Sequence, residues 1–324
     1  MQNRVATAFA NSNIAFVKYW GVRDAGLNLP LNDSISMNLS DATTVTTVEF
    51  GEFAADTLAI DGRPATSSQT ARAGRHLDHL RKLAGVGLRA RVVSRNSFPM
   101  GTGMASSAAG FAALTVAGCA ALGLDLTERE LSALARLGSG SACRSVPGGF
   151  TRWHAGHDHA SSYAETIAPP DHWDLRDVLA VVSTEHKAIG SAEGHTLAQT
   201  SPFLAARLAD LPRRLDHVQG ALLARDLPRL GEELEAEAIA LHVLAMTSRP
   251  PLLYWAPATI EIMRLCPVWR AEGLPVYFTL DAGPNVHLIC EAATAPTLIE
   301  RLQALPSVQR VLVNGPAGPT RLID

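Results

Sequence analysis

The stretch Pro99-Met-Gly-Thr-Gly-Met-Ala-Ser-Ser-Ala-Ala-Gly110 carries a glycine-bearing loop directly into the start of a predicted helix. Gly101 and Gly103 allow backbone N–H groups to turn inward, because a glycine has no side chain to clash. The helix expected from Ala105 adds unpaired amides and the positive end of its dipole. Such a pocket suits the phosphates of a nucleotide. The residues predicted to hold phosphate are Gly101, Gly103, Met104, Ala105, Ser106 and Ser107.

The two serines that open this helix add hydroxyl groups to the expected phosphate site. We expect the Ser107 hydroxyl to reach a phosphate-bound magnesium ion. The loop lacks the Lys-Ser/Thr pair of a Walker A loop and the G-x-G-x-x-G spacing of a dinucleotide-binding turn. Taken alone, it is also compatible with a glycine turn capped by serine. Other parts of the chain have to decide between these interpretations.

Bulk composition narrows the class of protein. The chain has 324 residues, 47% of them apolar and 18% charged, with a net charge of −3. These values predict a globular protein and argue against a nucleic-acid partner or a membrane surface. Four scattered cysteines without metal or redox spacing predict a reduced, cytoplasmic setting. We expect no signal peptide and no membrane span, because no apolar segment approaches the roughly 20 residues that a span needs.

Periodicity predicts mixed α and β structure in two halves. The first half, residues 1–187, is expected to hold the phosphate site, and the second half is residues 188–324. The expected strands are residues 5–9, 43–50, 88–94, 148–154, 177–183, 275–280, 286–290 and 308–313. The expected helices are residues 66–83, 105–122, 128–137, 202–225, 227–246, 258–272 and 293–305. The histidine-rich residues 154–159 are interpreted as a solvated hairpin tip rather than a metal site.

Three further polar clusters interrupt the apolar pattern. Lys18 lies in the run Asn13-Ile-Ala-Phe-Val-Lys-Tyr-Trp-Gly21, and burying a lysine is costly unless an anion meets it. It therefore either reaches the surface or points into an anion site. Arg144 follows small residues, so its guanidinium can grip a carboxylate or phosphate. Asp281 follows an apolar strand and precedes a Gly-Pro turn, which suits either a base facing a cleft or an Asx-turn.

Together these blocks make the chain resemble the mevalonate diphosphate decarboxylases of the GHMP kinase superfamily. The resemblance runs through Lys18-Tyr-Trp-Gly21, Ala105-Ser-Ser-Ala-Ala-Gly110, Gly138-Ser-Gly-Ser-Ala-Cys-Arg-Ser145 and Asp281-Ala-Gly-Pro-Asn285. A looser match surrounds Ser191-Ala-Glu-Gly-His195. The resemblance implies an α+β architecture, with an N-terminal lobe like ribosomal S5 domain 2 that binds ATP and a ferredoxin-like C-terminal lobe. It also implies a homodimer, although the sequence itself shows no interface.

The resemblance implies an ATP-driven decarboxylation in isoprenoid biosynthesis. The 3-hydroxyl of a 5-phosphorylated mevalonate is phosphorylated, and phosphate and CO2 then leave an isopentenyl product. Asp281 would orient or deprotonate the hydroxyl, Lys18 would keep Asp281 ionised, and Arg144 would hold the C1 carboxylate. The loop and its serines would hold ATP and Mg2+. The residues expected to contact substrate are Tyr19, Ser139, Ser141, Arg144, Val22 and Gln69.

Two positions depart from the family pattern. Val22 stands where the family motif Lys-Tyr-Trp-Gly-Lys-Arg-Asp has its second lysine. In an ungapped alignment of the helix before the phosphate loop, Gln69 stands where the family usually has an arginine near the start of that helix. Both changes remove positive charge from the end of the site expected to receive the 5-diphosphate. They favour mevalonate 5-phosphate as substrate and isopentenyl phosphate as product. The alternative is that Arg72 or Arg75 substitutes and that the substrate is mevalonate 5-diphosphate.

Two other functions remain open at this point. A mevalonate 3-kinase would stop after phosphorylation, but relatives of that kind generally lack the full set of Lys18, Arg144 and Asp281. A binding protein without turnover would be expected to have lost its aspartate or its phosphate loop. Neither loss is visible in the sequence.

Overall fold

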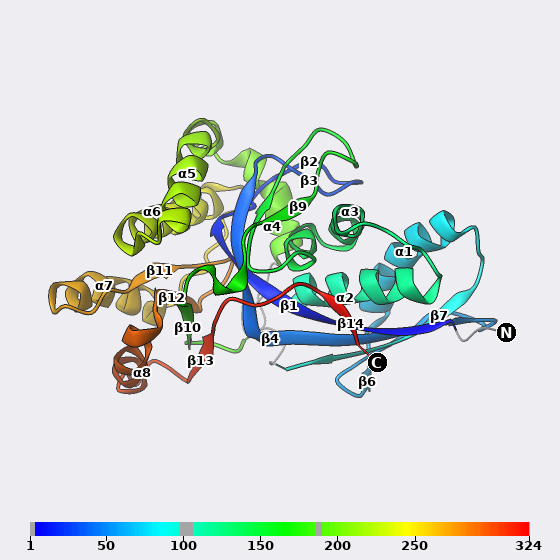
Figure 1. The fold of residues 1–324 in the computed structure, drawn as a ribbon. Coiled ribbons are helices and arrows are strands. Elements are labelled where there is room, and N and C mark those ends of the chain that lie inside the picture. Colours follow the sequence, from blue (N-terminus) through cyan, green and yellow to red (C-terminus); the bar gives the residue numbers. More distant parts are fainter. Residues whose placement is uncertain (1–3, 98–105, 186–189, 324) are drawn as a thin grey trace.

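The computed structural model describes residues 4–97, 106–185 and 190–323 of the chain. Figure 1 shows two halves side by side, a long twisted sheet with helices α1, α2 and α3 and a second region that contains helices α5 to α8. Each half joins a sheet to helices, as expected for α+β architecture. None of the helices in these residues is both long and apolar enough to span a bilayer.

The larger sheet is built on two long antiparallel strands, β1 (Val5–Val17) and β4 (Ser34–Gly51). The predicted strands at residues 5–9 and 43–50 are confirmed as parts of these longer elements. The sheet order among the described residues is β14-β1-β4-β7-β5-β6, with β8 on β4 and β9 on β8. The other strands of this sheet are β5 (Thr57–Ile60), β6 (Arg63–Pro64), β7 (Arg89–Asn96), β8 (Phe150–Trp153), β9 (Ala164–Ala168) and β14 (Arg321–Ile323).

Three helices lie on the same side of this sheet (Figure 1): α1 (Ser67–Ala84), α2 (Ser106–Ala121) and α3 (Glu128–Gly138). Helix α2 is buried along most of its length because its residues are small and apolar. Gly118 permits its close contact with α1, since a Cβ atom there would lie 2.6 Å from Leu80 Cδ1. The predicted helices at residues 66–83, 105–122 and 128–137 are confirmed within about two residues at their described ends.

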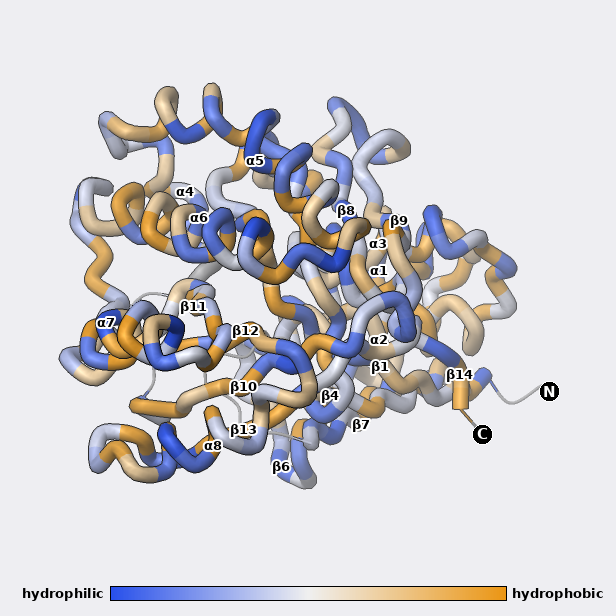
Figure 2. The backbone as a smooth tube through the Cα atoms, turned by 60° about the vertical axis from the view of Figure 1, so that its left-hand side comes forward, coloured by the Kyte–Doolittle hydropathy of each residue, from blue (hydrophilic) through white to orange (hydrophobic). Residues whose placement is uncertain are grey.

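The second sheet has the order β11-β12-β10-β13, and all its neighbouring strands are antiparallel. Its strands are β10 (Leu175–Val181), β11 (Tyr277–Thr279), β12 (Val286–Glu291) and β13 (Arg310–Asn314). The helices of this half are α4 (Ser191–Leu197), α5 (Leu204–Ala224), α6 (Leu227–Thr247), α7 (Pro257–Ala271) and α8 (Ala295–Gln303). Figure 2 shows hydrophobic and hydrophilic stretches alternating along these helices, as expected when one face is buried.

The two halves share a hydrophobic core, so they are joined by more than the chain. Phe16 and Val17 at the end of β1 pack in one cluster with Leu215 and Val218 of α5. Strand β10 precedes residue 187 but belongs to the second sheet, and β14 returns from the second half to the first sheet. The domain boundary near residue 187 stays a prediction. The shared core places the end of β1 at the junction of the halves.

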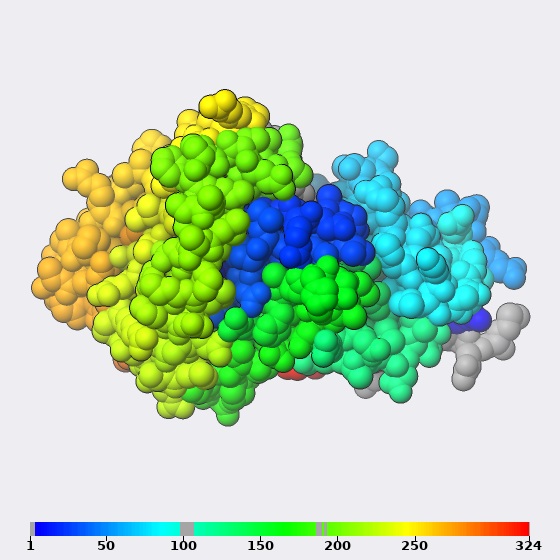
Figure 3. Space-filling view, turned by 90° about the horizontal axis from the view of Figure 1, so that it is seen from above, coloured from blue at the N-terminus to red at the C-terminus, as the bar shows by residue number. Residues whose placement is uncertain are grey.

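Two hairpins flank this junction. Strands β2 (Val22–Asp24) and β3 (Leu29–Pro30) form one, and residues 154–163 connect β8 to β9 in the other, with the predicted hairpin tip at residues 154–159. Arg23 donates a hydrogen bond to the Gly156 carbonyl, which ties the two hairpins together. Figure 3 shows the blue N-terminal residues lodged between the yellow-green helices and the green hairpin.

Candidate active site

The buried ammonium group of Lys18 meets the carboxylate of Asp281. Lys18 follows β1 and is 1% exposed, and its Nζ donates to Asp281 Oδ1 at 2.9 Å and to the Ala15 carbonyl at 2.6 Å. Asp281 lies in the turn between β11 and β12, where 27% of its side chain remains exposed. The two residues are far apart in sequence, and the fold brings them into contact. Lys18 therefore does not reach the surface, and the anion that its ammonium group meets is the carboxylate of Asp281.

Burial and mutual attraction set the ionisation of this pair. Burial lowers the pKa of Lys18, and the attraction of Asp281 opposes that shift. Burial alone would raise the pKa of Asp281, but its attraction to Lys18, and then to His287 and Arg144, outweighs burial and lowers that pKa. Asp281 is therefore held as a carboxylate at neutral pH. A carboxylate of low pKa is a weak base but a good acceptor for a hydroxyl group.

Arg144 supplies a second buried positive charge beside the pair. It lies in the 3-10 turn η1 (Gly140–Ser145) and is 4% exposed. Its guanidinium donates to Asn13 Oδ1 at 3.1 and 3.2 Å and to Ser34 Oγ at 2.7 Å. Among the described residues Arg144 forms no ion pair, although its charge acts on the pKa of both Lys18 and Asp281. A buried cation held only by neutral groups is suited to an anionic ligand.

Asn13 and Ser34 are site residues that the sequence reasoning did not single out. Asn13 accepts from Arg144 through its oxygen and donates through Nδ2 to the Ser145 hydroxyl at 2.8 Å and the Ser141 carbonyl at 3.2 Å. It therefore connects strand β1 to the turn that carries Arg144. The only signal in the sequence was a polar residue at the start of the apolar run that contains Lys18.

The predicted substrate residue Tyr19 packs beside this turn. Its ring lies in the space that a side chain at Gly140 would occupy, since a Cβ atom there would be 2.7 Å from the ring. The ring also packs against Trp153, with 4.7 Å between centroids. Burial raises the pKa of Tyr19, so its phenol stays protonated. Tyr19 is fixed as a neutral hydroxyl-bearing wall of the site.

His195 is a further site residue that sequence reasoning noted only within a loose match. Its ring stacks on Tyr19 with 3.9 Å between centroids, and its Nδ1 accepts the Gly21 N–H at 3.2 Å. Burial, and then the charge of Arg144, lower its pKa to about 3. Neutral His195 must therefore carry its proton on Nε2, because Nδ1 is the acceptor.

The expected phosphate loop is described only from its helix onward. Gly101, Gly103, Met104 and Ala105 lie outside the described residues, and Ser106 is described only as the first residue of α2. The Ser139 hydroxyl donates to Ser107 Oγ at 3.3 Å. The first turn of α2 therefore meets the turn that carries Ser141 and Arg144.

Gln69 and Val22 lie in different surroundings. Gln69 completes the capping box of α1 with Thr66 and lines a cavity that Ser107 also lines. Val22 lies in β2, and its carbonyl accepts a hydrogen bond from Gln199 Nε2 at 3.0 Å. The structure thus places Gln69 beside a residue expected to hold nucleotide. The roles of all these residues in binding stay predictions.

Comparison with known proteins identifies the family. A model of the diphosphomevalonate decarboxylase-like N-terminal domain matches residues 10–164, and one of the mevalonate 5-diphosphate decarboxylase C-terminal domain matches residues 178–313. The chain belongs to the diphosphomevalonate decarboxylase family. The predicted resemblance is thereby confirmed, and so is the expected enzyme class, a carboxy-lyase.

Relatives with two different substrate names resemble this decarboxylase about equally well. It is 39% identical to a diphosphomevalonate decarboxylase of Aspergillus fumigatus over 303 residues, covering 86% of this chain and 75% of that one. It is 36% identical to the phosphomevalonate decarboxylase of Haloferax volcanii over 286 residues, covering 87% of each. Family membership therefore leaves the number of phosphates on the substrate open.

Solved structures of decarboxylases share the whole fold. The mevalonate diphosphate decarboxylase of Staphylococcus aureus superposes with a TM-score of 0.94 at 33% identity, covering 99% of this chain and 98% of that one. A structure named MDDEF, in complex with MVAPP, AMPPCP and magnesium, gives 0.93 at 35% identity and 99% coverage of both. The predicted α+β GHMP kinase fold is confirmed. The expected homodimer stays a prediction.

Proposed function

We propose that this decarboxylase uses ATP to convert mevalonate 5-phosphate into isopentenyl phosphate, ADP, phosphate and CO2. The observation that carries the chemistry is the contact between buried Lys18 and Asp281 beside Arg144, a buried cation for which the described part of the chain supplies no ion pair. One anion and two cations in one place suit a substrate that has both a hydroxyl group to activate and a carboxylate to hold.

In the first step, the 3-hydroxyl oxygen attacks the γ-phosphorus of ATP, and the bond to the bridging oxygen of ADP breaks. Asp281 accepts a hydrogen bond from the hydroxyl and takes its proton as the new P–O bond forms. Because the pKa of Asp281 is low, we expect the proton to move late, when the new P–O bond is largely formed. Lys18 stays beside Asp281 and offsets negative charge that develops near it.

In the second step, the C3–O bond breaks and phosphate leaves with its bonding electrons. Positive character grows at C3, the C1–C2 bond breaks, and its electrons form the C2–C3 double bond as CO2 departs. Arg144 holds the C1 carboxylate in line until the bond breaks. Its own position is fixed by Asn13 and Ser34, so the guanidinium needs little rearrangement on binding.

The nucleotide has a suitable place beside Ser107. The cavity that Ser107 lines has apolar walls and polar groups, a combination that suits a heterocyclic base next to phosphates. Its other lining residues include Leu58, Ile60, Gln69, Arg72, Val92, Ser94, Asn96 and Phe111. Ser107 would hold Mg2+ through its hydroxyl, and the ion would neutralise charge on the transferred phosphoryl group. The neighbour MDDEF, in complex with AMPPCP and magnesium, supports the binding of a nucleotide and of magnesium.

The preference for one phosphate rests mainly on Val22. Apolar Val22 cannot neutralise a second phosphate, and Arg23 beside it is bonded to Gly156. Arg72, offered above as a substitute cation, donates to the Gly138 carbonyl at 2.9 and 3.2 Å and lies over the Phe111 ring. Gln69 carries less weight than the sequence suggested, because it shares a cavity with Ser107.

The diphosphate is the second candidate substrate. The neighbour MDDEF is a complex with MVAPP, and several relatives carry the diphosphomevalonate name. Steady-state measurement of kcat/KM on both substrates, with saturating ATP and Mg2+, separates the two. We expect a higher kcat/KM for the monophosphate. A higher value for the diphosphate would contradict the assignment.

Replacing Val22 tests the cause of this preference. We expect Val22→Lys to raise kcat/KM for the diphosphate by about tenfold and for the monophosphate by less, because a charged hydrogen bond contributes about 1.5–3 kcal/mol. Val22→Met is the matched control, since it adds length without charge and should leave the ratio of the two values unchanged. An equal change in both variants would show that charge at this position does not set the preference.

A further inference from the structure

The main chain of Lys18 is held on both sides of its Cα atom by side chains from other parts of the fold. Its N–H donates to Glu237 Oε1 at 3.0 Å. Its carbonyl accepts from Arg207 Nη2 and from Asn32 Nδ2, each at 3.0 Å. Glu237 lies on α6 and Arg207 on α5, more than 180 residues from Lys18 along the chain.

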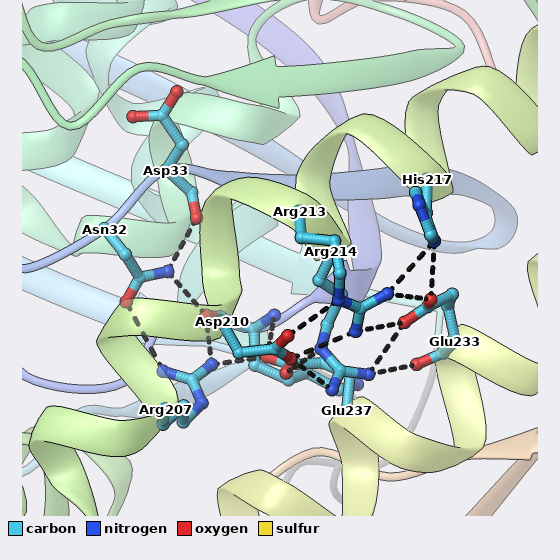
Figure 4. Close-up of polar contacts among 10 residues, drawn as sticks. Asn32, Asp33, Arg207, Asp210, Arg213, Arg214, His217, Glu233 and Glu237 are labelled. Carbon is cyan, nitrogen blue, oxygen red and sulfur yellow. Dashed lines mark hydrogen bonds and ion pairs between the residues drawn. The ribbon is translucent and has the colours of Figure 1, made fainter.

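The side chains of Glu237 and Arg207 that hold the Lys18 backbone belong to a buried cluster of charged residues. Glu237 is fully buried and Arg207 is 7% exposed, and the two also bond to each other. Arg214 lies 3.4 Å from the second oxygen of Glu237 and pairs further with Glu233 at 3.0 Å. Figure 4 shows these side chains reaching toward one another from neighbouring helices, with Asn32 alongside Arg207.

Stability alone gives little reason for such a cluster. Removing two charges from water costs several kcal/mol each, and apolar residues of similar volume often stabilise a core as well or better. The end of β1 already packs on α5 through apolar side chains such as Val17. What the charged groups add is direction, because hydrogen bonds at both the N–H and the carbonyl fix the orientation of a peptide backbone.

We propose that Glu237 and Arg207 are positioning residues, which hold the backbone of Lys18 so that its ammonium group meets Asp281. The inference rests on the role given to Lys18 in the proposed reaction. With both flanking peptide groups fixed, the Lys18 side chain leaves the backbone in one direction. Helices α5 and α6 of the second half thereby set the geometry of the site.

Glu237→Gln tests this role, with Glu233→Gln as the matched control. Both substitutions remove one carboxylate from the same cluster, but Glu233 contacts Arg213, Arg214 and His217 rather than Lys18. We expect Glu237→Gln to lower kcat between about tenfold and a hundredfold, the range that follows from small misplacement of a reacting group. The KM for ATP should change little. Glu233→Gln should keep kcat within about twofold while losing comparable thermal stability.

The pH profile of kcat gives a readout that general loosening would not move. The charged groups that act on Lys18 are Asp281, Glu237 and Arg144. Glu237 raises the pKa of Lys18, so its loss lowers that pKa further. We therefore expect activity to fall at a lower pH on the basic side in Glu237→Gln but not in Glu233→Gln. Equal kcat losses and unshifted profiles in both variants would overturn the proposal.

Two more variants keep the outcome interpretable. If Glu237→Gln does not fold, Arg207→Lys carries the same test, because a lysine keeps the charge but lacks the planar fork that bonds the Lys18 carbonyl and Glu237 through Nη2 and Asn32 through Nη1. An unchanged kcat in a folded Arg207→Lys protein would overturn the proposal. Lys18→Met distinguishes failure of the proposed reaction from failure of the positioning role. If it stays active, the proposed reaction is wrong, whereas an inactive Lys18→Met beside a fully active Glu237→Gln defeats only the positioning role.

Discussion

Three charged side chains carry the chemistry at the scale of single residues. Lys18 and Asp281 form a short ion pair, and Arg144 adds a buried positive charge bonded to neutral side chains. Together they leave the site with an excess of positive charge for a carboxylate and phosphates. Lys18 and Asp281 each act on the pKa of the other, and the charge of Arg144 lowers the pKa of both.

Replacing Asp281 with asparagine tests the residue expected to handle the proton. Asparagine keeps the size of the side chain but can neither take a proton nor neutralise Lys18. We expect Asp281→Asn to lower kcat by about a hundredfold to ten-thousandfold, the usual contribution of a general base. ADP release and CO2 release should fall together. A near-normal rate in a folded variant would remove Asp281 from its role.

Sequence reasoning reached the charged residues but missed the groups that hold them. Lys18 and Asp281 were recognisable because a charged side chain in or beside an apolar run is costly to bury unless it meets a partner or a ligand. Glu237 and Arg207 were not recognisable, since polar residues on helices are ordinarily solvated and their contact with Lys18 depends on distant packing. Asn13 was hidden in the same way, because its partner Arg144 is 131 residues away.

At the scale of elements, the sequence predicted where helices and strands lie better than where they end. Strand β1 continues from Val5 to Val17, although only residues 5–9 were expected. The polar residues Asn11 and Asn13 interrupt the alternation, yet both are buried and bonded, Asn11 to the Gly318 carbonyl at 2.9 Å. Their partners lie more than 100 residues away, so no local pattern shows that they belong to a strand.

The packing of α1 on α2 makes stability depend on pH through His76. This buried residue bonds the Thr115 hydroxyl at 2.8 Å, and burial, then His79 and Arg72, lower its pKa to about 3 from 6.5. Between these values the unfolded chain binds a proton that the folded protein does not. Stability is therefore full above about pH 6.5 and falls toward pH 3. The slope from one such group is up to about 1.4 kcal/mol per pH unit.

Chemical denaturation from pH 7 down to pH 4 measures this slope. We expect the free energy of unfolding to fall across this range and to fall less steeply in His76→Gln, which cannot take up the proton. His79→Gln is a control on the same helix, because the His79 side chain is exposed whereas that of His76 is buried. Identical slopes for wild type and His76→Gln would contradict the assignment.

At the scale of the whole molecule, the site lies where the two halves meet. Strand β1 delivers Lys18 from the first sheet, the turn after β11 delivers Asp281 from the second, and α5 and α6 hold the Lys18 backbone. Local sequence patterns indicated mixed α and β structure in two halves and no more. The GHMP kinase fold came from the family resemblance, because the order of strands in a sheet is set by pairings that periodicity does not encode.

Mass-resolved product analysis of the intact enzyme with ATP, Mg2+ and mevalonate 5-phosphate, run in parallel with mevalonate 5-diphosphate, tests the central chemistry most directly. We expect isopentenyl phosphate as the organic product, with ADP and CO2 released in equal amounts. ADP without CO2 would show a kinase that stops after phosphorylation. Turnover of the diphosphate alone would show that this site, with Val22 beside Arg23, accepts the second phosphate after all.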